Sequence, residues 1–313
     1  MMRLNLKFIF YKLITVVFLF QSLPAWSELA SSSDCRDLEI SSGAEESPSL
    51  YSDALLWKVS KGNSRASYIF GTIHVSDPEI INLPEKVSST LGQSDIFVME
   101  ALPLVDEALK FSQMMFFNDG TTLKDFIDDD LFEKTAEILS DYQFPPDAVN
   151  TMKPWAAFLI MNYPAETGLP LDMHLLQTAQ QNGAEVHGLE SLSEQGDVFT
   201  TMDYDEQVTL LLDTVCHYDV VKQDFEKLKS LYLERDLKGL FQQSNQYSFS
   251  KEPVYRDLMQ RLVVKRNYTM AERMQNILEK GNAFIAIGAM HLPGEEGVLS
   301  LLGKKGYKIH SLY

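Results

Sequence analysis

Basic residues are scarce in this chain of 313 residues, where 27 Lys and Arg stand against 44 Asp and Glu and leave a net charge of −17. So acidic a surface repels phosphate backbones and anionic lipids, and we therefore expect neither nucleic acid nor a membrane surface as a partner. The composition is otherwise that of a globular protein, with 45% hydrophobic and 23% charged residues. It excludes the disordered, collagen-like and coiled-coil classes.

Four motifs of common enzyme classes are also absent. The chain has no Gly-x-Ser-x-Gly nucleophile elbow, no Gly-x-x-x-x-Gly-Lys phosphate loop, no Gly-x-Gly-x-x-Gly dinucleotide turn and no His-Glu-x-x-His helix. Their absence argues against serine hydrolases, nucleotide-dependent enzymes and zincin-type metalloproteases.

Long apolar runs are missing except near the N-terminus. There Arg3 and two lysines precede the apolar run Leu13–Phe20, and Ala25-Trp26-Ser27 places small residues at the −3 and −1 positions. This pattern predicts a secretory signal peptide over residues 1–27. An uncleaved anchor is the alternative, but the run is well short of the roughly 20 apolar residues that span a bilayer. We expect an exported, periplasmic protein without stable membrane insertion after cleavage.

Only two cysteines occur, Cys35 and Cys216. An exported chain folds under oxidising conditions, where a disulfide would tie the N-terminal tail to the body. Two free thiols are the alternative, because pairing geometry cannot be read from a sequence. Residues 28–50 are rich in Ser, Glu and Asp and predict a flexible lead-in, whereas residues 51–313 are expected to form one domain.

Short apolar strands alternate with helices, which predicts an α/β fold with a central sheet and flanking helices. The first two strands suggest a hairpin, and strand–helix–strand units of the parallel type follow. The expected strands are Leu56–Val59, Ala66–Phe70, Ile96–Met99, Ala184–Leu189, Ala283–Ile287 and Tyr307–Leu312. Between them, residues 104–164 and 205–276 are predicted to be two helical insertions.

Two segments of the chain have the same form. Tyr68–Val75 and Ile285–Leu292 each contain an apolar strand, then Gly-x-x-His, then an aliphatic residue. They suggest a duplicated strand–Gly-x-x-His unit, although a match of this length can also arise by chance. Gly71 and Gly288 permit a sharp turn that would aim each histidine back over the edge of the sheet.

Four acid–base or metal-ligating residues follow predicted strands: His74, Glu100, Glu190 and His291. The carboxyl ends of parallel strands meet at one edge of a sheet, so these side chains should converge there. Two imidazoles and two carboxylates suit a divalent first-row metal with an open position, where bound water has a pKa of roughly 7. We predict that the two histidines and Glu100 hold the metal, and that a carboxylate, Glu100 or Glu190, acts as base. Singly, each residue could instead be a backbone cap or a solvated rim charge.

Arg266 is a further candidate, because a guanidinium can bind a substrate carboxylate or stabilise an oxyanion. Asn267 accompanies it, Arg273 competes with it, and a position on a helix surface is an equal alternative. The remaining histidines have no convergent carboxylate in this pattern and are predicted to be surface or packing residues: His174, His187, His217 and His310.

Several of these motifs together resemble the TraB/PrgY/GumN family. Tyr68–Pro78 is similar to the first motif of that family, and Arg266–Ala271 and Gly288–Gly294 are similar to its C-terminal motifs. Internal landmarks agree as well, and the similarity extends from Leu56 to Tyr307. These landmarks are Lys153-Pro154-Trp155, Leu171-Asp172 and Gly188-Leu189-Glu190 with Gln195.

The paired Gly-x-x-His motifs also resemble those of the Tiki metalloproteases. The resemblance implies peptide cleavage with Mn²⁺ or Co²⁺, and it implies active-site positions at His74, Glu100, Arg266 and His291; Zn²⁺ is a further candidate. Members of this family are also described as pheromone-shutdown factors, and relatives of the fold include haem-binding proteins, so family membership alone does not establish an activity.

These observations favour an exported metal-dependent hydrolase, a peptidase acting on a peptide or small-molecule substrate. A periplasmic binding protein that holds a peptide or haem without turnover is the competing hypothesis. A structural accessory protein is the third. Metal content separates the third hypothesis from the first two, and turnover separates the first from the second.

Overall fold

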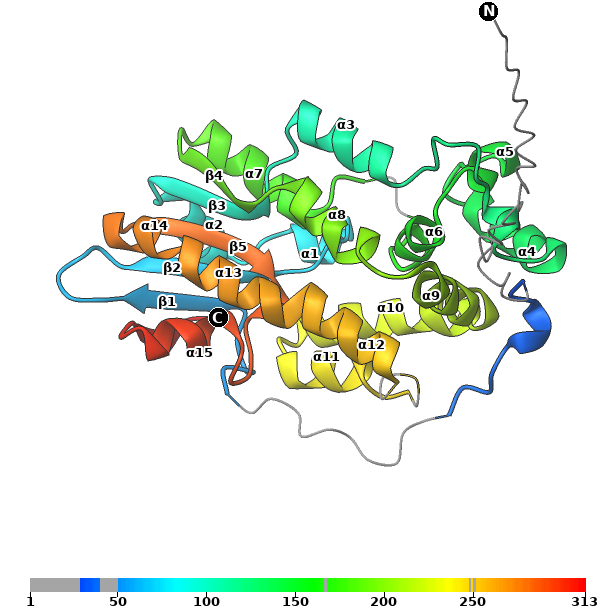
Figure 1. The fold of residues 1–313 in the computed structure, drawn as a ribbon. Coiled ribbons are helices and arrows are strands. Elements are labelled where there is room, and N and C mark those ends of the chain that lie inside the picture. Colours follow the sequence, from blue (N-terminus) through cyan, green and yellow to red (C-terminus); the bar gives the residue numbers. More distant parts are fainter. Residues whose placement is uncertain (1–28, 40–49, 166–167, 248, 250–251) are drawn as a thin grey trace, which may run out of the picture.

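The computed structural model describes residues 29–39, 50–165, 168–247, 249 and 252–313 (Figure 1). The predicted signal peptide, residue 28 and residues 40–49 of the lead-in lie outside this part of the chain. Export, cleavage and the division into lead-in and domain therefore stay predictions.

One six-stranded mixed sheet, in the order β4-β3-β5-β2-β1-β6, forms the centre of the fold. Strands β4, β3, β5 and β2 are parallel, and β1 pairs antiparallel with both β2 and β6. This confirms the predicted α/β class, the central sheet and the first hairpin. The strands are β1 Leu56–Ser60, β2 Ser67–Thr72, β3 Ile96–Ala101, β4 Glu185–Glu190, β5 Ala283–Gly288 and β6 Lys308–Ser311.

The central position of β5 follows from its composition. Every residue from Ala283 to Ile287 is apolar and buried, which suits a strand covered on both faces by helices. Phe284 packs between Phe70 of β2 and Phe97 of β3, with ring centroids 5.9 and 6.3 Å away. This packing keeps the three parallel strands in register beneath the site that lies at their carboxyl ends.

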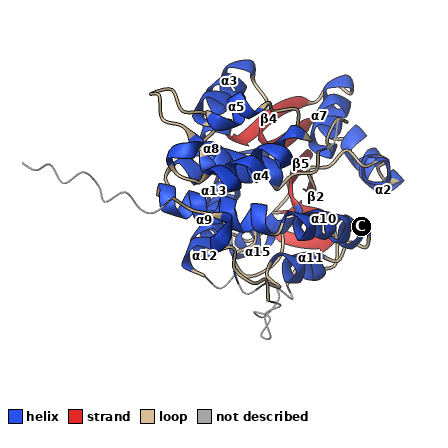
Figure 2. Ribbon diagram, turned by 90° about the vertical axis from the view of Figure 1, so that its right-hand side faces the viewer, coloured by secondary structure: helices blue, strands red, loops and turns tan. Residues whose placement is uncertain are grey.

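A first group of helices packs along the sheet. Helix α7 contacts β3 and β4, α13 contacts β4, α14 contacts β5, and α15 contacts β6. Figure 2 shows the red strands enclosed by blue helices. The helices of this group are α1 Pro78–Ile81, α2 Glu85–Gly92, α7 Leu171–Gln181, α13 Arg266–Arg273, α14 Gln275–Lys280 and α15 Val298–Lys304.

The two predicted helical insertions are confirmed. Helices α4, α5, α6 and α9 of these insertions gather at one end of the molecule, beyond the carboxyl ends of the parallel strands (Figure 1). They share an apolar core of their own, in which Leu131 and Met152 of the first insertion pack with Leu211 of the second. The helices of the insertions are α3 Val105–Met114, α4 Asp129–Ser140, α5 Pro146–Asn150, α6 Pro154–Met161, α9 Tyr204–Cys216, α10 Tyr218–Leu233, α11 Leu237–Ser244 and α12 Pro253–Met259. Helix α8 Leu192–Thr200 precedes the second predicted range, and α13, which that range includes, packs against β4 of the sheet.

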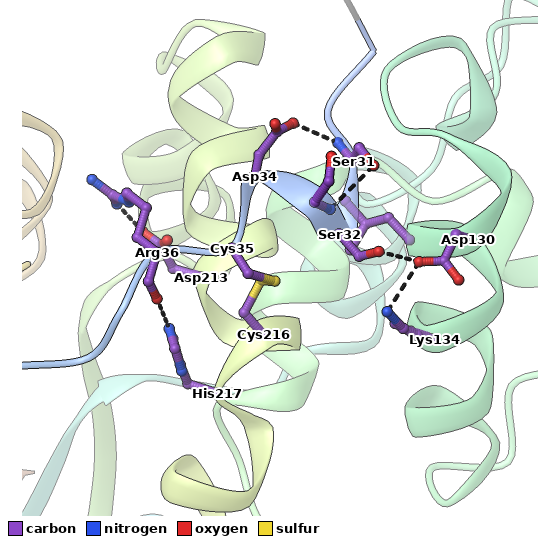
Figure 3. Close-up of a disulfide and its surroundings, with 12 residues drawn as sticks. Ser31, Ser32, Asp34, Cys35, Arg36, Asp130, Lys134, Asp213, Cys216 and His217 are labelled. Carbon is purple, nitrogen blue, oxygen red and sulfur yellow. Dashed lines mark hydrogen bonds and ion pairs between the residues drawn. A yellow bond between two sulfur atoms is a disulfide. The ribbon is translucent and has the colours of Figure 1, made fainter.

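A disulfide joins Cys35 to Cys216 at the end of α9, with the two Cα atoms 5.7 Å apart (Figure 3). Of the two alternatives left open by the sequence, the bridge is therefore the one found. Beside it, Arg36 donates to Asp213 at 2.5 Å and also pairs with Glu252. His217 Nε2 lies 2.9 Å from the Arg36 carbonyl oxygen, which makes His217 a packing residue. These contacts attach the described part of the lead-in, residues 29–39, to the second helical insertion.

None of the helices among the described residues combines the length and the apolarity that crossing a membrane requires.

Candidate active site

The carboxyl ends of the four parallel strands meet at one edge of the sheet, as their order requires. Thr72 at the end of β2 lies opposite Gly288 of β5, and Ala101 of β3 lies opposite Glu190 of β4. The Gly288 N–H donates to Glu100 Oε1 at 2.6 Å and so ties the ends of β5 and β3 together. A Cβ atom at this glycine would stand 3.2 Å from the same oxygen, so a side chain here would crowd the carboxylate.

Arg266 binds both strand-end carboxylates. Its Nη2 donates to Glu100 Oε2 at 2.5 Å and its Nε to Glu190 Oε2 at 2.9 Å. The Arg266 side chain is 14% exposed, so the alternative of a helix-surface arginine is wrong. Burial lowers the pKa of Arg266, but the two carboxylates raise it above its ordinary value, and the charge is retained. The π-helical segment Gln260–Lys265 precedes this arginine, whose Nη1 donates back to the Leu262 carbonyl at 3.0 Å.

Glu100 accepts three hydrogen bonds although it is buried. Besides those from Gly288 and Arg266, its Oε2 accepts one from Gln195 Nε2 of α8 at 3.3 Å. Burial alone would raise the pKa of Glu100, but the imidazoles, the guanidinium and the backbone N–H around it hold that pKa well below its usual range. Glu100 is therefore a carboxylate at neutral pH.

His291 is buried and its tautomer is set by its neighbour. Its Nδ1 lies 2.7 Å from Asn267 Oδ1, while Asn267 Nδ2 donates to the Glu296 carbonyl at 2.9 Å. Because the amide nitrogen faces a carbonyl, the amide oxygen must face the imidazole, and Nδ1 carries the proton. Burial lowers the pKa of His291 to about 4. Its bare Nε2, 3.6 Å from Glu100 Oε1, is then a neutral ligand atom.

His74 is held in a similar way but by a carboxylate. Its Nδ1 lies 2.6 Å from Asp172 Oδ2, and Thr72 Oγ1 donates to the other oxygen of Asp172 at 2.7 Å. The imidazole is closely surrounded by protein atoms and still 42% exposed to solvent. Burial lowers the pKa of His74, but the charge and hydrogen bond of Asp172 outweigh it and raise that pKa to about 9.

The donor chemistry of these residues fits a divalent metal ion. Both imidazoles direct Nδ1 at a side-chain oxygen, which is how metal-binding histidines are usually oriented. Neither Nε2 atom has a hydrogen bond to a described residue, and that of His291 faces Glu100. Among the described residues, however, no group of three or more His, Cys, Asp or Glu side chains is close enough together to hold an ion. The predicted ligands His74, His291 and Glu100 are thus oriented for a metal without forming a complete ligand set.

Three residues of the site were not assigned these positions by sequence reasoning: Asp172, Asn267 and Tyr163. Asp172 lies in the first turn of α7, where an acidic residue ordinarily serves the helix terminus, and only the Leu171-Asp172 family landmark could have indicated it. Asn267 was named only as a companion of Arg266. Tyr163 follows α6, and its ring centroid lies 6.1 Å from that of His74. No motif marks it.

The competing candidates lie elsewhere. Arg273 donates to Glu194 of α8 at 2.7 Å and to the Leu189 carbonyl at 2.7 Å, so its guanidinium is used to hold α8 in place. His187 Nε2 lies 2.8 Å from Glu185 Oε1 within β4, and His310 lies on β6 at the far edge of the sheet.

The fold and site define an α/β protein with two strand–Gly-x-x-His units on adjacent parallel strands, beside an arginine that binds two carboxylates. The chain belongs to the TraB/PrgY/gumN family, whose model matches residues 55–311.

Known relatives of this chain include metalloproteases. It is 24% identical to Metalloprotease TIKI2 of Danio rerio over 82% of this chain and 60% of that protein. It is 24% identical to human Metalloprotease TIKI1 over 82% of this chain and 61% of that protein. It is also 22% identical to the uncharacterised protein YbaP of Shigella flexneri, over 81% of this chain and 98% of that protein. The chain thus spans about three fifths of the length of these metalloproteases, and no solved structure matches it.

Proposed function

We propose that this protein is an exported metal-dependent hydrolase that cleaves peptides. The observation that supports this function best is the pair of histidines whose Nδ1 atoms are held by Asp172 and Asn267, beside a buried and ionised Glu100. The metalloprotease relatives support the same reaction class. Mn²⁺ and Co²⁺ are the proposed metals by resemblance, and Zn²⁺ is the alternative.

In this proposal His74 Nε2, His291 Nε2 and Glu100 hold the ion. A bound divalent metal supplies a water of lowered pKa and polarises the carbonyl of the substrate. Arg266 helps to keep Glu100 ionised, because its buried guanidinium donates to this carboxylate, and it also pairs with Glu190. Glu190, which is 4% exposed, is the carboxylate proposed to accept the proton of the attacking water.

Export follows from the predicted signal peptide. The disulfide between Cys35 and Cys216 supports an oxidising compartment, and we propose the periplasm.

Calorimetric titration of Mn²⁺, Co²⁺ and Zn²⁺, together with cleavage assays on a peptide library, tests the metal and the reaction. His74→Ala and His291→Ala should each lose most metal affinity and all metal-dependent cleavage, because each removes an imidazole ligand. His310→Ala is the matched control and should retain both, since His310 lies on the outer strand β6. Unchanged metal affinity in both site variants would refute the shared metal site.

The two carboxylates are distinguished by amide substitutions. Glu100→Gln should weaken metal binding, because Glu100 is the proposed ligand. Glu190→Gln should retain the metal and lose turnover, because Glu190 is the proposed base. The opposite pattern would exchange their roles.

A binding protein without turnover is the second candidate. Two observations favour it. Arg266, Gln195 and Gly288 already donate hydrogen bonds to the Glu100 carboxylate, and the described residues contain no complete group of metal ligands. Such a protein should bind a peptide, or haem with a Soret absorbance band, and release it unchanged. Product analysis of the same peptide library by mass spectrometry separates binding from cleavage.

A further inference from the structure

The side chain of Tyr163, from the first helical insertion, lies at the edge of the sheet where the candidate site is found. It follows α6, in the first helical insertion, and its ring lies beside that of His74 with the centroids 6.1 Å apart. The residue is 41% exposed, so its side chain can be reached from solvent. No hydrogen bond from its hydroxyl to any of the described residues is found.

The backbone of Tyr163 is fixed independently of this side chain. Its N–H donates to the Ile160 carbonyl at 3.1 Å, and its own carbonyl accepts from the Tyr142 hydroxyl at 2.6 Å. Pro164 follows and restricts the backbone conformation of the tyrosine before it. The backbone that carries the phenol is therefore held in place before a ligand arrives, which is one part of a preorganised site.

The charges around the phenol all belong to the proposed active site. Glu100, Asp172 and Arg266 are near enough for their charges to act on it. A tyrosine hydroxyl is ordinarily protonated at neutral pH, because the unperturbed pKa of a phenol is about 10, and it can therefore donate a hydrogen bond. An O–H group that has no acceptor among the described residues, next to the histidine proposed to hold the metal, is available for an acceptor atom on the substrate.

We propose that Tyr163 is a catalytic residue of this hydrolase, whose hydroxyl donates a hydrogen bond to the oxygen of the scissile carbonyl. The proposal rests on the function proposed above. During hydrolysis the oxygen of water bonds to the carbonyl carbon, and the electron pair of the C=O π bond moves to the carbonyl oxygen. When the C–N bond breaks, the pair returns and the amine leaves with a proton from the water. Tyr163 acts where negative charge develops, so its bond is stronger in the transition state than in the bound substrate.

Tyr163→Phe removes only the hydroxyl and is the decisive variant. Loss of one oxyanion donor typically costs about 10²- to 10³-fold in kcat, so we expect a fall of this size with KM changed less than about threefold. A phosphinic peptide that mimics the tetrahedral geometry should lose affinity in the same proportion, whereas Mn²⁺ affinity and the thermal unfolding midpoint should stay as in the wild type. Tyr204→Phe is the matched control, because Tyr204 is 42% exposed and packs against Phe126 of the first helical insertion, with the ring centroids 4.7 Å apart.

Each outcome has a distinct meaning. A wild type that turns over peptides while Tyr163→Phe keeps its kcat within about twofold overturns the role of Tyr163 and leaves the hydrolase intact. Loss of Mn²⁺ affinity in Tyr163→Phe also overturns it, because the residue would then act by supporting His74. A wild type without metal-dependent cleavage refutes the proposed function itself, and the role of Tyr163 with it.

Discussion

His74 Nδ1 lies 2.6 Å from the carboxylate of Asp172, a residue 98 positions further along the chain. The histidine of the second Gly-x-x-His unit, His291, has an amide oxygen of Asn267 in the equivalent place. A carboxylate stabilises the imidazolium and an amide does not, which contributes to the contrast between a pKa of about 9 for His74 and about 4 for His291. The repeated motif thus presents two histidines of different protonation behaviour to one site.

The first prediction concerns the pKa of His74. In the metal-free protein, NMR titration should find its imidazole with a pKa of about 9, and Asp172→Asn should lower that pKa toward 6.5 because the partner's charge is lost. Asn267→Asp is the converse control and should raise the pKa of His291. If the pKa of His74 were near 6.5 in both the wild type and Asp172→Asn, the ion pair between His74 and Asp172 would be contradicted.

The same pair makes stability depend on pH in a defined direction. The folded-state pKa of His74 is raised, so its contribution is fully present below about 6.5 and is lost as the pH rises through about 9. Urea unfolding should therefore show Asp172→Asn less stable than the wild type at pH 6, with a smaller difference at pH 10. A stability difference that grows with pH would contradict this prediction.

Metal binding must displace the proton of the His74 imidazole, so Mn²⁺ affinity should increase toward pH 9.

Among the charged residues, we expect replacement of Arg266 to lower the free energy of unfolding most. Arg266→Ala leaves two buried carboxylates without their cation, and breaking a buried ion pair from one side costs about 3–5 kcal/mol. Arg273→Ala is the control, because Arg273 is 41% exposed and an exposed pair contributes about 0–1 kcal/mol. The free energies of unfolding at pH 7 decide the matter, and equal losses in the two variants would rule out the buried network.

The disulfide is predicted to stabilise the chain strongly, because it links residues 181 positions apart. Replacing Cys35 and Cys216 by Ser should lower the free energy of unfolding by about 3–5 kcal/mol. Reductant should destabilise the wild type by a similar amount and leave the double variant unaffected. Two reactive thiols in the denatured, unreduced wild type would show that the bridge does not form.

The last prediction is removal of the signal peptide. Mass spectrometry of the exported protein should find Glu28 or a neighbouring residue at its N-terminus, because Ala25 and Ser27 occupy the −3 and −1 positions. Replacing both by Arg should block cleavage and leave the precursor in the membrane fraction. Intact Met1 in wild-type protein would argue for the anchor instead.

The local sequence was sufficient to predict the strands and the carboxyl ends of the strands, where the candidate site lies. The apolar run before Gly288 predicts a buried strand, and Glu100 follows another such run, because a strand buried on both faces needs apolar side chains at almost every position. The convergence of Glu100, Glu190 and His291 on one edge then follows from the parallel order of their strands. These features depend on neighbours within a few residues and on a general rule of sheet topology.

Which side chains bind one another could be decided only by the tertiary structure. Arg266 could equally have been a surface residue, and only the fold shows it between two carboxylates from different strands. Asp172, Tyr163 and the Cys35–Cys216 bridge are likewise set by the packing of segments about 90 to 180 residues apart. A sequence records the hydrophobic periodicity that makes each helix and strand, whereas a hydrogen bond or ion pair requires atoms to meet within a few ångströms. That proximity is set only when the helical insertions pack against the sheet. The strands that lead to the candidate site residues could therefore be predicted from the sequence, whereas the side chains that bind those residues could not.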